Sequence, residues 1–304
     1  WTPNFNVPMR DSLLWFYEGQ TQYWGYVLAT RAGLWTHQQA LDAIALTAAA
    51  YDHHVGRAWK SLEDTTNDPI TAHRRPIPWR SWQRSEDYYS EGQLVWFDAD
   101  TLIRQMSGGK KSLDDFAKAF FGINNGSFVT VTYTFDDVVK ALNAVQPYDW
   151  AKFLRTRLDE HAAGAPLDGI TRGGYKLVYT GKESDFEKSY EKVRKFTDFS
   201  YSLGFSVDKD NKLTDVQWGG LADKAGFTVG MKLMAVNGDA YSADALKDAI
   251  TWAGSDKAPI KLLVEDNKQF RTLTIDYHGG LRYPHLQPQG AGTHSLDAIL
   301  NPRS

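Results

Sequence analysis

Hydrophobic and polar residues alternate with helical spacing through most of the first 163 positions of the chain. Apolar residues that recur every three or four positions predict an amphipathic helix, and a serine, threonine or aspartate before the run predicts where the helix begins. The segments that fit are 11–32, 36–51, 85–106, a helix capped by Ser112, 134–144 and 149–163. The first part of the chain is therefore predicted to be mostly helical.

Residues 56–84 interrupt this pattern with three prolines and a cluster of arginines. They predict a long loop, and long loops in compact domains are often functional. His73 in this loop either lines a cleft or, as the polar surroundings favour, faces solvent. Further along, 175–179 predicts a short strand, and the charged run 183–196 is helix-like and is interpreted as a connector.

The pattern changes near Phe199, where short β-type runs begin to alternate with glycine and Asx turns. One helix, 243–252, interrupts these runs, and a tail rich in glycine and proline is expected to wrap the surface. The predicted division is a helical domain at 1–182, a charged connector at 183–198, a β-rich domain at 199–278 and a C-terminal tail at 279–304.

Composition narrows the functional classes. The chain has 304 residues, 42% hydrophobic and 23% charged, which suits two globular domains. A net charge of −3 gives no basic surface for nucleic acid. No apolar run reaches the roughly 18 residues of a membrane span. The absence of cysteine excludes disulfides, thiol catalysis and thiolate metal sites.

One acidic residue lies within the aromatic helix 14–23, whose sequence is L-W-F-Y-E-G-Q-T-Q-Y. A carboxylate buried among aromatic rings is costly without a cation or a hydrogen-bond donor, so Glu18 either faces solvent or binds something. The pattern W-F-Y-E-G-x-T-x-Y resembles the helix that supplies the third zinc ligand in gluzincin aminopeptidases. That resemblance implies that Glu18 is a zinc ligand.

The β-rich region resembles the PDZ family. It contains S-L-G-F at 202–205, G-G-L-A-D-K-A-G-F at 219–227 and G-M-K-L-M-A-V-N-G at 230–238, in the order of that family. A PDZ domain binds a peptide by adding it as a strand and by holding a carboxylate on loop amides. The groove residues implied here are Leu203, Gly204, Phe205, Ser206, Val207 and Leu246. The alternative is a groove that is empty or filled by the chain's own segments.

The combination of the Glu18 helix with a C-terminal PDZ domain resembles the glycyl aminopeptidases. Three further strings agree with that family: G-R-A-W-K-S-L-E-D at 56–64, D-Y-Y-S-E-G-Q-L-V at 87–95 and L-D-A-I-L at 296–300. The resemblance implies a mostly α-helical, thermolysin-like gluzincin catalytic subdomain followed by an α+β PDZ domain. It also implies a zinc-dependent release of N-terminal glycine or alanine from peptide substrates.

The resemblance suggests roles for particular residues. The tyrosine of the Y-x-x-G motif, Tyr89, is the candidate hydroxyl donor to the oxyanion, with Tyr88 as the second choice; the alternative is an ordinary core tyrosine. His53 and His54 are interpreted as a helix end, because adjacent helical residues point about 100° apart. The pair Asp136 and Asp137 is explained by helix capping.

The chain contains no H-E-x-x-H motif, so two zinc ligands and the general base of the family are missing from it. We expect the chain by itself to be inactive and to be completed by a missing N-terminal half of the same protein. The alternative function is a non-catalytic peptide-binding protein that uses its PDZ domain, with a peptide C-terminus as ligand. A periplasmic or secreted location is favoured over a cytoplasmic one.

Overall fold

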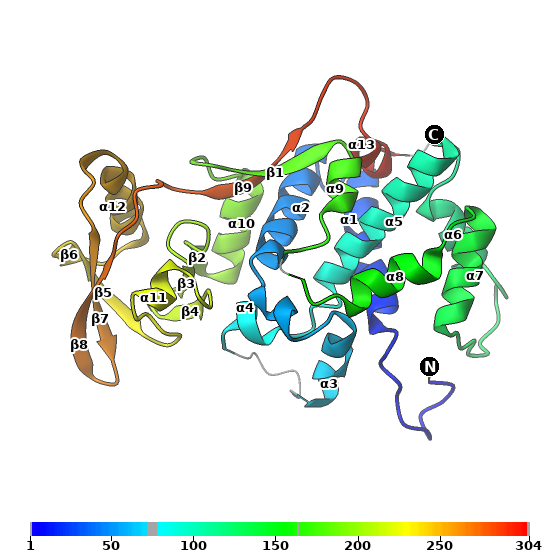
Figure 1. Cartoon of the computed structure of the whole chain (residues 1–304), viewed down its shortest axis with the longest axis horizontal. Coiled ribbons are helices and arrows are strands. Elements are labelled where there is room, and N and C mark those ends of the chain that lie inside the picture. The colour runs from blue at the N-terminus through cyan, green and yellow to red at the C-terminus, as the bar shows by residue number, and fades with distance from the viewer. Residues whose placement is uncertain (1, 72–77, 163, 303–304) are drawn as a thin grey trace.

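A computed structural model describes residues 2–71, 78–162 and 164–302, and His73 lies outside them. Figure 1 shows a helical part on the right and a smaller β-rich part on the left, with α10 between them. The α-helices are α1 Leu14–Arg31, α2 His37–Asp52, α3 Asp68–Thr71, α4 Arg80–Gln83, α5 Ser90–Ser107, α6 Leu113–Phe121, α7 Phe135–Val145, α8 Trp150–Asp159, α9 Asp168–Arg172, α10 Asp185–Arg194, α11 Leu221–Lys224, α12 Ala243–Asp256 and α13 Ser295–Leu300. The strands are β1 Tyr175–Thr180, β2 Phe196–Asp198, β3 Phe205–Asp208, β4 Leu213–Val216, β5 Lys232–Val236, β6 Asp239–Ala240, β7 Ile260–Asp266, β8 Gln269–Ile275 and β9 Tyr283–Pro288.

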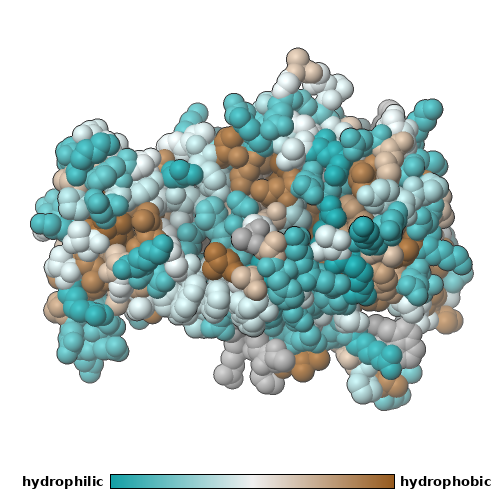
Figure 2. Space-filling model, viewed as in Figure 1, coloured by the Kyte–Doolittle hydropathy of each residue, from teal (hydrophilic) through white to brown (hydrophobic). Residues whose placement is uncertain are grey.

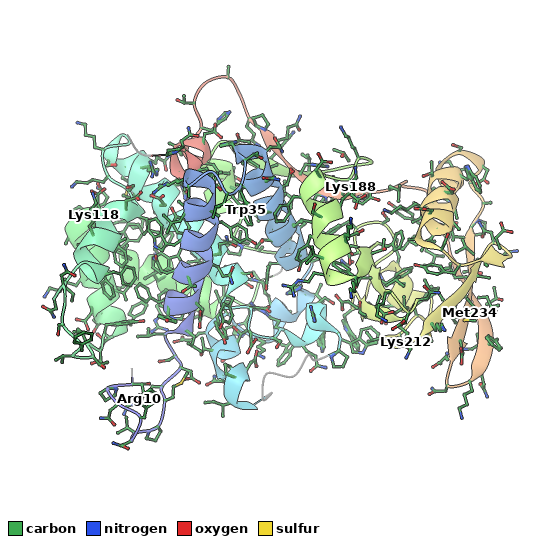
Figure 3. The ribbon with its side chains drawn as sticks, turned by 180° about the vertical axis from the view of Figure 1, so that it is seen from behind. Arg10, Trp35, Lys118, Lys188, Lys212 and Met234 are labelled. Atoms are coloured by element: carbon green, nitrogen blue, oxygen red, sulfur yellow. The ribbon has the colours of Figure 1, made fainter. Side chains whose placement is uncertain are left out.

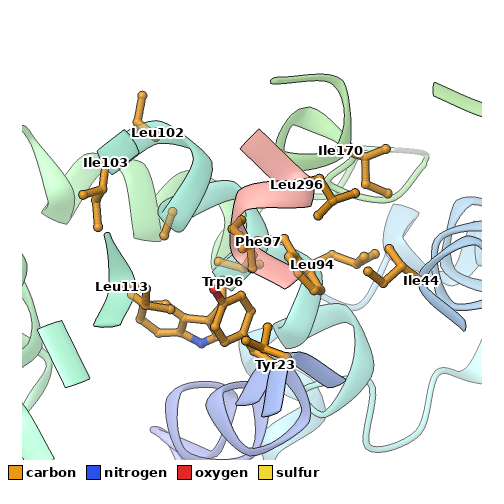
Figure 4. Packing of buried hydrophobic residues seen from close by; sticks show 14 of the residues in the cluster. Tyr23, Ile44, Leu94, Trp96, Phe97, Leu102, Ile103, Leu113, Ile170 and Leu296 are labelled. Atoms are coloured by element: carbon orange, nitrogen blue, oxygen red, sulfur yellow. The ribbon is translucent and has the colours of Figure 1, made fainter. Parts of the chain in front are cut away.

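The helical domain, residues 2–182 with the returning segment 283–302, has one hydrophobic core built around α1 and α5. Thirteen consecutive residues of α5, from Glu91 to Ile103, are buried, so this helix runs through the middle of the domain. Trp96, Phe97 and Leu94 of α5 pack beside Tyr23 of α1 (Figure 4). A large share of the aromatic residues of the sequence lies in this core.

Helices α1 and α5 approach each other through two glycines. A Cβ atom added to Gly19 would lie 3.0 Å from the carbonyl carbon of Gly92, and one added to Gly92 would lie 3.1 Å from the Cα of Gly19. The indole rings of Trp15 and Trp96 stack beside this crossing at 5.9 Å. Any side chain larger than hydrogen would separate the two backbones, so the crossing requires glycine on both helices.

The C-terminal tail returns to the helical domain, and this corrects the expectation that it wraps the surface. Strand β9 pairs antiparallel with β1, from Tyr175 opposite Pro288 to Thr180 opposite Tyr283. Helix α13 then buries Leu296, Ile299 and Leu300 in the main core. The tail stays bound because the burial of these apolar side chains stabilises it by more free energy than the ordering of its glycine- and proline-rich segment costs.

The β domain, residues 196–281, has a separate core of buried aliphatic and aromatic side chains. One sheet has the order β2-β3-β4 and the other β6-β5-β7-β8, with antiparallel pairing throughout. Helix α12 packs on β5 and β7. Strand β2 belongs to this domain by pairing, although its residues fall in the segment predicted to be a connector. The whole is a mixed architecture of helices and small antiparallel sheets.

Most helix starts agree with the capping signals in the sequence. Thr36, Ser112 and Thr134 each form a capping box with the residue three positions on. The molecular surface has a mixed character, with hydrophilic residues spread between smaller hydrophobic areas (Figure 2). The predicted strand at 175–179 and the helix in 183–196 are also confirmed, as β1 and α10.

Several helix boundaries differ from the prediction, and two of these differences have a cause in the segment 56–84. Helix α5 begins at Ser90 and not at Ser85, because Arg84 and Glu86 adopt positive φ angles of 51° and turn the chain before the helix can start. Helix α8 ends at Asp159 and not near residue 163, since Glu160 is extended and the Arg57 guanidinium holds the carbonyl of Ala162 at 3.2 Å. Both differences come from buried arginines of the 56–84 segment, which also contains short helices.

The glycine crossing makes a prediction about stability. Gly92→Ala should destabilise the protein by about 1–3 kcal/mol, because the added methyl group meets backbone atoms that cannot move independently. The measurement is chemical denaturation followed by circular dichroism. Gly25→Ala is the matched control on α1: its added Cβ has nothing within 4 Å, so it should stabilise by about 0.5–1 kcal/mol. Equal effects from the two substitutions would refute a tight crossing.

Candidate active site

The glycine crossing brings Glu18 and Tyr89 together from 71 residues apart in the sequence. Glu18 is half-buried on α1, directly before Gly19, and Tyr89 is the N-cap residue of α5, three positions before Gly92. The Tyr89 hydroxyl donates a hydrogen bond of 2.9 Å to Glu18 Oε1. The two residues that the sequence singled out separately therefore form one polar pair.

A third residue, Tyr133, lies beside this pair and was missed in the sequence analysis. Tyr133 packs on Phe16 with ring centroids 5.1 Å apart, just before α7 begins. Burial, followed by the nearby charges of Tyr17 and Glu18, raises the pKa of Tyr133 to about 12. No motif marks Tyr133, because it lies between helices in a segment without periodic spacing. It remains a neutral phenol beside the Glu18 carboxylate at physiological pH.

The N-terminus of α5 is fixed by a buried ion-pair network. Glu91 is fully buried and accepts hydrogen bonds from the guanidinium groups of Arg57 and Arg84. Arg84 also reaches Asp87 at 2.8 Å, and His54 Nδ1 lies 3.3 Å from the same carboxylate. The strings G-R-A-W-K-S-L-E-D and D-Y-Y-S-E-G-Q-L-V thus meet in space through Arg57 and Glu91, two residues from Tyr89.

The network shifts the pKa values of residues that belong to it. Burial, with the neighbouring charge of Arg84, lowers the pKa of Arg57 to about 10. Burial alone would raise the pKa of Asp87, but the facing His54 and Arg84 outweigh it and hold that pKa below its usual value. With the pKa of Arg57 above neutral pH and that of Asp87 below its usual value, these two residues stay charged at pH 7, and the network positions the first turn of α5.

The donor atoms of this chain do not by themselves complete a zinc site. A catalytic zinc needs three protein ligands, and Glu18 supplies one carboxylate. Among the residues that the structure describes, no three histidine, aspartate or glutamate side chains come together in a way that could hold a metal ion. His53 is the C-cap of α2 and His54 is directed to Asp87, which confirms that this histidine pair is a helix end.

The expected peptide groove of the β domain is occupied by the chain itself, which agrees with the alternative that the chain's own segments fill it. Strand β2 pairs with the edge of β3 that a peptide would use, with Thr197 opposite Val207 and Asp198 opposite Ser206. The loop amides of Leu203 and Gly204 donate to the Phe199 carbonyl at 2.8 and 3.0 Å.

The side chains predicted to line that groove are also unavailable. Leu203, Phe205, Ser206, Val207 and Leu246 are all buried. The amide of Gly204 donates to the carbonyl of Phe199 and is likewise used within the chain. The physical reason is local: residues 196–199 lead directly into the loop, and an adjoining segment pairs with the strand at a smaller entropic cost than a separate peptide.

The comparisons with known proteins now bear on this geometry. The family model of the M61 glycyl aminopeptidases matches residues 1–95, the segment that contains Glu18, Tyr89 and the ion-pair network. The fold is similar to the crystal structure of an aminopeptidase N family protein from Idiomarina loihiensis, with a TM-score of 0.71 and 18% sequence identity. That match covers 98% of this chain and 50% of the other, so this chain spans half the length of that protein. No curated protein matches the sequence.

The family match over residues 1–95 agrees with the resemblance to the glycyl aminopeptidases that the sequence motifs predicted. The neighbour is described as an aminopeptidase N family protein, and at this identity the likeness concerns the fold. In the described part of the chain, none of the helices has the length and apolar character needed to cross a membrane.

The network around Glu91 generates a second prediction. Glu91→Gln should destabilise the folded chain by about 3–5 kcal/mol, because it leaves two buried arginines without their shared carboxylate. Urea denaturation at pH 7 measures the change. Glu160→Gln removes a half-exposed carboxylate 3.9 Å from Arg57 and should cost at most about 1 kcal/mol. A loss no larger for Glu91→Gln than for Glu160→Gln would show that the network does not hold α5.

Proposed function

We propose that this chain contributes one carboxylate and one phenol to the active site of a zinc-dependent aminopeptidase that releases N-terminal glycine or alanine. The observation that carries the proposal is the 2.9 Å hydrogen bond between Tyr89 and Glu18. Both residues lie inside the segment that matches the glycyl aminopeptidase family. The similarity of fold to an aminopeptidase N family protein gives further support.

Glu18 would be one of three zinc ligands, and the other two would come from residues that this sequence does not contain. When bound, such a metal polarises the scissile carbonyl and activates water. Glu18 suits a ligand role because it is half-buried at a fixed helix crossing and not on a mobile surface. The chain on its own is expected to be inactive towards peptides.

Tyr89 has two tasks in this proposal. Its hydroxyl orients the Glu18 carboxylate by donating to Oε1, as partners of ligands commonly do. The same hydroxyl would turn to the oxyanion that forms on the substrate carbonyl. The position favours this second task, since Tyr89 caps the N-terminus of α5, where the helix dipole stabilises negative charge.

The competing proposal is a non-catalytic peptide-binding protein that uses a PDZ-like β domain. The order of strands and helices in residues 196–281 is compatible with such a domain. A peptide C-terminus would first have to displace β2 from β3 and free the loop amides from Phe199. No observation favours that exchange, so the aminopeptidase proposal is the better supported of the two.

The ligand role of Glu18 can be tested in the protein that includes the complementary half. Glu18→Ala should lose the zinc and nearly all aminopeptidase activity, because two remaining ligands do not hold the ion tightly. Elemental analysis measures the metal, and cleavage of a glycyl arylamide measures the activity. Full zinc occupancy in Glu18→Ala would remove Glu18 from the metal site.

The role of Tyr89 is tested separately by Tyr89→Phe in the same protein. Loss of one oxyanion donor should lower kcat by about 100-fold or more with little change in KM, because the bond strengthens mainly in the transition state. Zinc content should stay unchanged. Tyr88→Phe is the control, since Tyr88 is buried in the core. If Tyr89→Phe keeps its kcat within a few-fold of the parent, the tyrosine serves packing and not catalysis.

A further inference from the structure

A cavity between the helical domain and the β domain is lined by many acidic side chains. It has a volume of about 790 Å³, within the usual range of small-molecule sites. Helix α10 forms one wall: in Figure 3 it carries Lys188 and lies between the part of the chain with Trp35 and the part with Lys212 and Met234. The carboxylates along the described lining are Glu86, Asp87, Glu187, Glu191, Asp198, Asp208 and Asp215, against the basic residues Arg80, Arg194 and Lys195.

Glu187 is the residue that points to a ligand. Only 2% of it is exposed, and neither carboxyl oxygen has a hydrogen-bond partner among the described residues. Asp215 of β4, on another element lining the same cavity, also has a buried oxygen, Oδ1, without such a partner. Arg80 and His54 act on the charge of Asp215, whereas neither oxygen of Glu187 has a hydrogen-bond partner among the described residues. Because buried carboxyl groups are normally paired, Glu187 indicates a missing cationic partner.

The surroundings of Glu187 are acidic on every side. Glu183 and Glu191 lie one turn before and after it at α10, and Asp198 faces it from β2. Among the described residues, Lys247 of α12 brings a cation to this group, and its Nζ is 3.5 Å from Glu183 Oε2. Burial, followed by the charges of Asp198, Glu191 and Glu183, raises the pKa of Glu187 to about 9.

Aromatic rings complete the lining. Tyr26, Tyr51, Phe186 and Tyr201 border the cavity together with the carboxylates. The ring of Phe186 is fixed against Trp35 at 5.2 Å, which anchors α10 to the helical domain. Aromatic faces attract ammonium groups, and carboxylates neutralise them, so acids and rings together suit an organic cation.

A metal ion does not fit this arrangement. Within the described ranges no three acidic or histidine side chains converge on one point, so the carboxylates are too widely spaced for a single ion. We propose that this cavity binds an elongated organic cation with primary ammonium groups, such as an aliphatic diamine or a lysine side chain, held between Glu187 and Asp215. The cavity lining does not include Glu18 or Tyr89, although it shares Asp87 and His54 with the network at the start of α5.

The test is isothermal titration calorimetry of the full chain with cadaverine as the probe. We expect saturable binding of cadaverine and none of 1,5-pentanediol, which has the same length without charge. Glu187→Gln and Asp215→Asn should each weaken binding by about tenfold or more. Asp185→Asn is the matched control on α10, since its side chain is 97% exposed, and it should bind like the parent.

A second readout distinguishes this site from surface attraction. Glu187 is protonated when the cavity is empty, so an ammonium group must displace its proton on binding. Titration in buffers of different ionisation enthalpy should show proton release at pH 7, and affinity should rise by up to about tenfold per pH unit between pH 6 and pH 8. In Glu187→Gln the proton release should disappear.

The ligand source is separated by a parallel titration with Nα-acetyl-lysine methylamide. Binding of this compound but not of cadaverine would assign the site to a lysine side chain, and the reverse result to a free diamine. The proposal is overturned if the parent binds neither compound. It is equally overturned if Glu187→Gln and Asp215→Asn bind them as well as Asp185→Asn does, because the cations would then be held elsewhere.

Discussion

The contact between Gly19 and Gly92 is the constraint on which the candidate active site depends. Because neither residue has a side chain, the backbones of α1 and α5 come close enough for the Tyr89 hydroxyl to reach Glu18. A wider crossing would separate the two polar groups beyond hydrogen-bond range. The glycines of the two motifs are thus explained by packing, and the polar residues beside them by what that packing brings together.

A second feature, the buried network of Arg57, Arg84 and Glu91, explains why the segment before α5 is irregular. The chain must turn at Arg84 and Glu86 so that Arg84 can reach both Asp87 and Glu91. Ion pairs of this kind contribute little net stability compared with apolar packing, but they tolerate few alternative geometries. Here the network fixes the start of α5, and with it the position of Tyr89.

The two domains use buried polar groups in opposite ways. In the helical domain the buried charges around Glu91 are matched by arginines. At the boundary with the β domain, Glu187 and its acidic neighbours have far less positive charge facing them. Strand β2 closes the edge of β3 on the same side of the molecule, so the β domain presents this acidic cavity and not an open strand edge.

The local sequence determined those helix starts whose defining contacts join residues close together in the chain. The capping boxes at Thr36, Ser112 and Thr134 predicted three helix starts, because a cap involves residues only three positions apart. The motifs around Glu18 and Tyr89 singled out each of these residues separately, and the family match covers both.

Other features were decided by contacts between distant segments. The delayed start of α5 depends on Arg84 meeting Glu91 and on Arg57 arriving from another loop, and the burial of the tail depends on a core formed by residues far earlier in the chain. No periodic pattern in the sequence predicted that Tyr133 would lie beside Glu18 or that β2 would pair with the edge of β3. Local patterns encode caps and amphipathic faces, whereas which buried charges meet, and which edge is covered, is settled only when tertiary packing brings separate segments into contact.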